Sequence, residues 1–102
     1  MRRISYNYRL SEEAEWDVYE SFLWYENQRL GLGEEFLEEL ELAENAITSN
    51  PEGFAFRYKK KVRAYVMGRF PILILYIING KNIDVIAVFN TNQHPKKWKN
   101  RV

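Results

Sequence analysis

Cysteine is absent from the 102-residue chain, and histidine occurs once, as His94. The lack of thiols excludes disulfides, thiolate zinc sites and a cysteine nucleophile, and a single histidine cannot supply the ligands of a transition-metal site. No N-terminal stretch resembles a signal peptide, and the longest apolar run, residues 72–78, is too short to span a bilayer. We therefore expect a cytoplasmic protein that binds no metal, no cofactor and no membrane.

Charges of opposite sign are unevenly distributed along the chain. Residues 1–56 hold 4 basic and 13 acidic side chains, whereas residues 57–102 hold 11 basic side chains and 1 acidic one. This asymmetry predicts a polyanionic or acidic partner for the basic half, or acidic helices that neutralise basic strands within the molecule. The hydrophobic fraction of 46% indicates a folded chain, and the length indicates a single domain, residues 1–102.

The spacing of apolar residues predicts the order of the secondary-structure elements. Alternation over residues 1–10 predicts a strand, and Ser11 with the glutamates after it predicts the start of a helix that ends at Gly31. A short turn, Leu32–Gly33, leads to a second amphipathic helix, which Pro51 ends. A loop over residues 51–58 is expected next. The remaining strands are predicted at Val62–Met67, Ile72–Ile78 and Ile83–Phe89, with an Asn79–Gly80 hairpin between the last two.

This order predicts an α+β fold, β-α-α-β-β-β, in which an antiparallel helical hairpin packs on one face of a small antiparallel sheet. The first strand should lie at the edge of the sheet. The run Ile72–Ile78 should lie at the centre, because it is apolar on both faces. No predicted element covers the other face of the sheet, so we expect basic and aromatic side chains of the later strands to line it.

The first predicted helix has two apolar faces. One face consists of Ala14, Val18, Phe22 and Tyr25, and the other of Trp16, Tyr19, Leu23 and Leu30. A helix that is apolar on two sides usually lies between two layers. One layer is the sheet, and the other is the second helix or another protein.

Basic and aromatic side chains are interspersed through the C-terminal half. The basic residues are Lys59, Lys60, Lys61, Arg63, Arg69, Lys96, Lys97, Lys99 and Arg101, and the aromatic ones are Phe56, Tyr58, Tyr65, Phe70 and Trp98. Cations bind phosphates and flat rings stack on unpaired bases, so this set fits RNA. It fits capture of an acidic peptide or a solvated surface equally well.

His94 is the natural candidate for acid–base chemistry, because its side chain titrates near neutral pH. A lone histidine in a polar tail is more often a solvated side chain. Paired catalytic carboxylates are not expected, because the acidic residues before position 53 fall mainly on helix faces, and no motif supports a Ser-His-Asp site or a phosphate-binding loop.

Four segments in this order resemble the RelE/ParE superfamily, the toxins of type II toxin–antitoxin, or plasmid-stabilisation, modules. They are WYENQRLGLGEEFLEEL (24–40), NPEGFAFRY (50–58), RAYVMGRFPILILYII (63–78) and VIAVFNTNQHPKKW (85–98). The resemblance implies a helical hairpin against a small antiparallel sheet. It also implies a growth-inhibiting toxin that a cognate antitoxin neutralises, with Trp16, Tyr19 and Leu23 as candidate antitoxin-binding residues.

The superfamily has two main modes of action. RelE-type members cleave mRNA on the ribosome with basic residues and a C-terminal acid–base residue, whereas ParE-type members inhibit DNA gyrase without that complete set. Here Arg69 matches a conspicuous RelE-type arginine, but the tail has no tyrosine and reads Asn90-Thr91-Asn92 where RelE-type members often keep an arginine. The resemblance therefore favours a ParE-like gyrase inhibitor, with a RelE-like endoribonuclease or a degenerate non-toxic member as alternatives.

The resemblance also implies roles for the basic residues. In the endoribonuclease alternative, the candidate catalytic residues are Arg69, Arg63, His94 and Lys97. The candidate residues for binding the target or nucleic acid are Lys59, Lys60, Lys61, Lys96 and Trp98. The expected partners are the antitoxin and either DNA gyrase or the ribosome and its mRNA.

Overall fold

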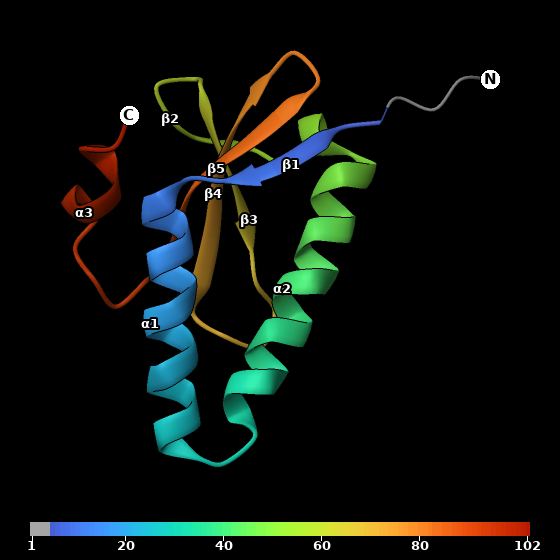
Figure 1. Cartoon of the computed structure of the whole chain (residues 1–102). Helices are drawn as coiled ribbons and strands as arrows, with labels where there is room; N and C mark the ends of the chain where they lie inside the picture. Colours follow the sequence, from blue (N-terminus) through green and yellow to red (C-terminus); the bar gives the residue numbers. More distant parts are fainter. Residues whose placement is uncertain (1–4) are drawn as a thin grey trace.

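A computed structural model describes residues 5–102, in which two long helices pack against a five-stranded sheet (Figure 1). The elements are β1 (Asn7–Leu10), α1 (Glu12–Gln28), α2 (Leu32–Ser49), the 3-10 helix η1 (Pro51–Gly53), β2 (Phe56–Tyr58), β3 (Val62–Val66), β4 (Ile72–Asn79), β5 (Asn82–Asn90) and α3 (Lys96–Lys99). The predicted α+β class is confirmed. The first four residues of the predicted N-terminal strand lie outside the described residues.

The strands lie in the order β1-β5-β4-β3-β2. Neighbours from β5 to β2 pair antiparallel, which was predicted for β3, β4 and β5, and β4 is central and buried. The first strand lies at the edge, as expected, but it pairs with β5 in parallel, with Asn7 opposite Asn82. The sheet is therefore mixed. Alternation in the sequence predicts a strand but not the direction of its neighbour, and the elements between β1 and β5 provide the long connection that parallel pairing needs.

The predicted loop over residues 51–58 is wrong in part, because it contains η1 and β2. Strand β2 has three residues, and its pairing with β3 shifts register between Phe56 and Tyr58. A strand this short and irregular leaves no period-two pattern in the sequence.

The helical hairpin is fixed by caps at its N-terminus and at its turn. The Ser11 hydroxyl accepts the Ala14 N–H at 3.1 Å, which caps α1. The Glu26 carboxylate accepts the N–H groups of Gly31 and Gly33, so α2 already begins at Leu32 rather than after Gly33. A Cβ on Gly33 would lie 2.7 Å from the Phe22 ring, so this close approach of the two helices requires glycine.

One core lies between the helices and the sheet. It contains Ala14 and Tyr25 of α1, Phe36, Ala43 and Ile47 of α2, and the inward side chains of β4 and β5, including Ile74, Tyr76, Ile83 and Val85. The Tyr76 hydroxyl donates to the Pro51 carbonyl at 2.6 Å, which ties the central strand to η1. The hairpin therefore covers this face of the sheet, as the sequence predicted.

The other face of the sheet is also covered, contrary to our expectation. The Trp98 side chain of α3 is 3% exposed and packs with Leu73, Leu75, Ala87 and Phe89 in a second core. Its ring meets Tyr58 and Phe89 edge-on, with centroids 5.5 and 6.5 Å apart. A four-residue helix rich in lysine has no amphipathic pattern, so this cover could not be predicted from the sequence.

Two charged side chains close the part of the β5 edge that β1 leaves open. Strand β1 pairs with residues 82–85 of β5 only. Beyond them, Asp17 of α1 accepts the Val88 N–H at 3.0 Å and Arg101 donates to the Ile86 carbonyl at 2.9 Å. The two side chains also pair with each other at 2.6 Å, and both are about 90% buried, at 11% and 10% exposed. This pair provides hydrogen-bond partners for the edge of β5 and ties the C-terminus to α1.

Candidate functional site

The apolar stripe of α1, defined as Trp16, Tyr19 and Leu23, lies on the surface. These side chains are 58%, 54% and 42% exposed, and the first two rings meet edge-on with centroids 5.8 Å apart. The α1 face that carries Ala14 and Tyr25 is the one buried against α2 and the sheet. The stripe is therefore a second apolar face that nothing in residues 5–102 covers.

Acidic side chains surround the stripe. Glu12, Glu13 and Glu15 occupy the first turn of α1, and Glu20 lies beside Tyr19, all exposed. Trp24, one turn beyond Glu20, is 61% exposed and was not among the candidates predicted from the sequence. An apolar surface rimmed by carboxylates suits a partner segment that is apolar with basic flanks.

The lysine candidates gather at one hairpin turn and at α3. Lys59 and Lys60 form the turn between β2 and β3, with φ of 55° and 49°. Lysine rarely adopts this left-handed conformation, which glycine or asparagine would occupy at lower cost. Lys61 next to them is exposed, as are Lys96 and Lys97 on α3. Lys59 and Lys60 therefore combine a strained backbone conformation with exposed positive charge.

The Tyr58 ring connects these two groups of lysines. The Nζ atoms of Lys59 and Lys99 lie 5.0 and 5.1 Å from its centroid. The seven lysines, all within residues 5–102, form no ion pair, whereas Arg9, Arg29, Arg69 and Arg101 each pair with a carboxylate. Within residues 5–102, the lysines and the exposed Arg57 therefore carry the positive charge that no carboxylate pairs with, and the other arginines hold structural contacts.

The burial of Trp98 bears on its predicted role in target binding. Its ring lies in the second core, so it does not offer a free face for stacking on a base. Lys96, Lys97 and Lys99 extend from the same helix into solvent. The structure thus separates the basic residues of the tail, which are accessible, from its tryptophan, which holds α3 in place.

The four candidate catalytic residues have separate surroundings. Arg63 donates to the carbonyls of Glu52 and Phe54 at 3.1 and 2.7 Å, near the start of β3. Arg69, beyond the end of β3, pairs with Glu35 of α2 at 2.7 Å. The carboxylate raises the pKa of Arg69, and in turn Arg69, followed by Arg29, lowers the pKa of Glu35. Both guanidinium groups are thus engaged at opposite ends of one strand.

His94 and Lys97 lie in the tail, away from both arginines in sequence. The His94 side chain is exposed, and its Nδ1 accepts the Lys96 N–H at 3.1 Å, which closes the turn into α3. A ring nitrogen used in this way stabilises the turn. The hydrogen-bond partners of Arg63, Arg69 and His94 therefore lie in three different segments of the chain.

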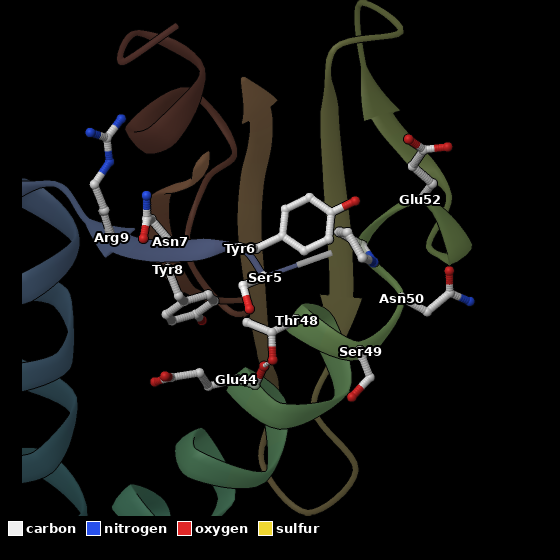
Figure 2. A pocket seen from close by; sticks show the side chains of 11 residues that line it. Ser5, Tyr6, Asn7, Tyr8, Arg9, Glu44, Thr48, Ser49, Asn50 and Glu52 are labelled. Carbon is white, nitrogen blue, oxygen red and sulfur yellow. Dashed lines mark hydrogen bonds between the residues drawn. The ribbon is translucent and has the colours of Figure 1, made fainter. Parts of the chain in front are cut away.

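A broad hollow of about 1200 Å³ lies beside β1 at the end of α2 (Figure 2). Figure 2 shows Tyr6 and Tyr8 near Glu44 and Thr48, with Glu52 of η1 on the far side. Burial, followed by the charge of Glu44, raises the pKa of Tyr8, so its hydroxyl stays protonated at neutral pH. Burial also raises the pKa of Tyr76, which lies near Tyr8, to about 12. The charged residues of the lining are Glu44, Glu52 and Arg9.

Residues 5–102 contain neither a cluster of metal ligands nor a membrane-spanning helix. Within this range, no group of three or more histidine, aspartate or glutamate side chains is placed to hold a metal ion. Across the same residues, none of the helices combines the length and the apolar character that crossing a membrane requires.

Comparison with known proteins bears on the fold. No protein-family model matches the chain, and no curated protein matches its sequence. A solved chain described as "Chromosomal ParDE TA system from P. aeruginosa" superposes with a TM-score of 0.75, over 86% of this chain and 98% of that one, at 13% identity. TA stands for toxin–antitoxin. At this identity the similarity shows the fold alone: the chain has a fold found in a ParDE toxin–antitoxin system.

Proposed function

We propose that the chain is the toxin of a two-component toxin–antitoxin module and that an antitoxin restrains it by binding the α1 stripe. The observation that carries the proposal is the exposure of Trp16, Tyr19 and Leu23 on a helix whose opposite face is fully packed. The fold shared with a ParDE system and the sequence resemblance to RelE/ParE toxins support the same conclusion. In this proposal, binding of the antitoxin covers the stripe.

The proposed target is DNA gyrase, which the toxin inhibits by binding in the cytoplasm. This choice rests on the resemblance to ParE-type members and on the separate surroundings of the catalytic candidates. Arg69 is paired with Glu35, and Arg63 is bonded to main-chain carbonyls. Binding requires a complementary surface only, whereas RNA cleavage requires an acid, a base and cations around one phosphate.

Induction in a bacterial host tests this proposal. The chain is expressed alone and, where a short gene adjoins its own, together with the product of that gene as the candidate antitoxin, and growth is followed. The proposal predicts arrest alone and recovery on co-expression, with purified chain inhibiting gyrase supercoiling. Normal growth at high expression would contradict the toxin assignment, and unaffected supercoiling would contradict the choice of target.

The runner-up function is ribosome-dependent mRNA cleavage. It is favoured by one observation, the unpaired lysines at the β2–β3 turn and on α3, which suit a phosphate backbone. This function predicts codon-registered cuts in mRNA after induction, and it predicts that Arg69→Ala abolishes the cuts while the protein stays folded. Intact mRNA during growth arrest would rule it out in favour of gyrase.

A further inference from the structure

A cleft of about 310 Å³ opens between α1 and the segment that follows β5. Glu20, Ser21 and Trp24 form its α1 wall, and Asn92, Gln93 and Lys97 are among the residues of the opposite wall. The volume lies at the lower end of the range for small-ligand sites, which is roughly 300–1000 Å³. The cleft is separate from the α1 stripe and from the candidate catalytic arginines.

Polar groups without partners line this cleft. Within residues 5–102, the side chains of Ser21, Asn92 and Gln93 make no hydrogen bond, although each can donate and accept. Tyr25 also lines the cleft and is 8% exposed, and its hydroxyl is the sole buried side-chain nitrogen or oxygen of that range without a partner. That hydroxyl has almost no accessible surface, so it is closed off from the cleft, whereas the polar side chains of Ser21, Asn92 and Gln93 are accessible to a ligand.

The types of side chain indicate a planar ligand with hydrogen-bonding edges. Trp24 is 61% exposed and presents an aromatic ring at the cleft. Carboxamides such as Asn92 and Gln93 bind base edges through paired donors and acceptors, and a carboxylate such as Glu20 accepts from an exocyclic amine. Aromatic rings stack on unpaired bases of any sequence.

The charges at the cleft suit a nucleotide rather than a simple cation or anion. Asp17 also lines the cleft, but Arg101 neutralises it. Lys97 faces the cleft and begins the series of unpaired lysines, which continues through Lys99 to the Tyr58 ring and Lys59. These ammonium groups lead away from the cleft along the surface, where phosphates of adjoining nucleotides would be neutralised.

We infer that this cleft binds one unpaired base of a single-stranded nucleic acid. Trp24 stacks on the base, Glu20, Asn92 and Gln93 bind its edge, and Lys97 with the lysines beyond it binds the phosphates. The inference adds a site to the proposed toxin and does not depend on which target the toxin has.

Fluorescence anisotropy of labelled ten-nucleotide homopolymers, DNA and RNA, tests the inference with the purified chain. Trp24→Ala is expected to weaken binding about tenfold with the same salt dependence, because it removes a stacking surface and no charge. Trp16→Ala is the matched control, since this tryptophan is 58% exposed on the same helix but outside the cleft, and it should leave affinity unchanged.

Two further variants separate base contacts from phosphate contacts. Lys97→Gln should lower the slope of log affinity against log salt by about 0.7, the change for one phosphate on a single strand. The double variant Asn92→Ala/Gln93→Ala should reduce the differences in affinity among the homopolymers and keep the salt slope. Thermal melting of each variant should match that of the parent chain.

Equal effects of Trp24→Ala and Trp16→Ala, or absence of binding at low salt, would overturn the inference. Loss of binding to the co-expressed partner on Trp24→Ala, with no change toward oligonucleotides, would also overturn it, because the cleft would then serve a protein. Growth arrest and its reversal are scored separately. If they persist without oligonucleotide binding, the nucleic-acid site fails and the toxin assignment stands.

Discussion

The helices α1 and α3 pack against opposite faces of β5 and place tryptophan in opposite ways. On α1, Trp16 and Trp24 are 58% and 61% exposed, whereas Trp98 on α3 is 3% exposed. The long helix is held by a full apolar face, so its tryptophans are free for other partners. The short helix of four residues is held mainly by one ring and by the Arg101–Asp17 pair that follows it. In our proposals the exposed rings of α1 are binding surfaces, whereas the buried ring of α3 is a structural contact.

The largest difference between the two helices is expected in stability. Trp98→Ala should lower the free energy of unfolding by about 4 kcal/mol, because a large buried ring is replaced by a cavity. Trp16→Ala should change it by less than about 0.5 kcal/mol, because the ring is exposed. Urea denaturation of both variants measures the contrast. Similar losses at the two positions would show that the division between binding and structural tryptophans is wrong.

The ion pair that ties α3 to α1 should rank next. Arg101→Ala leaves Asp17 buried without its cation and is expected to cost about 3 kcal/mol. Asp17 raises the pKa of Arg101, so the pair stays intact at alkaline pH. Arg9→Ala is the control, since its pair with Asp84 is 56% and 32% exposed and should contribute less than about 1 kcal/mol. A loss for Arg101→Ala no larger than for Arg9→Ala would contradict the tethering role.

Backbone strain at the lysine turn predicts a stabilising change. Lys60 has φ of 49°, so Lys60→Gly should raise the free energy of unfolding by about 1 kcal/mol. Lys61→Gly, at a neighbouring exposed position outside the left-handed region, should lower it by a few tenths to about 1 kcal/mol. Thermal or urea melts give both values. A destabilised Lys60→Gly variant would show that the turn carries no strain.

The smallest expected effect comes from Glu35. Its pKa is lowered, chiefly by the hydrogen bond from Arg69 and then by that from Arg29, so the charged carboxylate is favoured in the folded state. The stabilisation is present above the unfolded pKa of about 4.5 and is lost as the pH falls through the folded pKa. Glu35→Gln should lower the melting temperature slightly at pH 7, and this difference should shrink as the pH falls below 4.5. Glu41→Gln, which is exposed and outside any ion pair among residues 5–102, should show no such pH dependence.

The parts of the fold that short local sequence patterns determine could be predicted from the sequence. Continuous apolar residues marked β4, Ser11 marked the start of α1, and Asn79–Gly80 marked the hairpin, in which Gly80 has φ of 61°. The direction of β1 and the existence of β2 depend on pairing with distant strands, which short segments do not encode.

Some residues of the candidate site could be predicted from local periodicity, whereas those that depend on long-range contacts could not. Exposed helical positions follow from period alone, so Trp16, Tyr19 and Leu23 were found as a second face of α1. The pairing of Arg101 with Asp17 joins residues 84 positions apart and has no local pattern. The same holds for Trp98, whose lysine neighbours suggested an exposed patch although its ring is buried. The sequence alone therefore did not show which side chains make long-range contacts and which remain exposed.

Neutralisation of the double variant Trp16→Ala/Leu23→Ala by the co-expressed partner tests whether the α1 stripe is the antitoxin-binding surface. Both side chains are exposed, so the variant should fold and arrest growth like the parent chain. We expect the partner to restore growth with the parent chain and to fail with the variant, because the variant lacks the side chains that the antitoxin binds. Equal rescue of the parent chain and the variant would contradict the assignment of the α1 stripe as the antitoxin-binding surface.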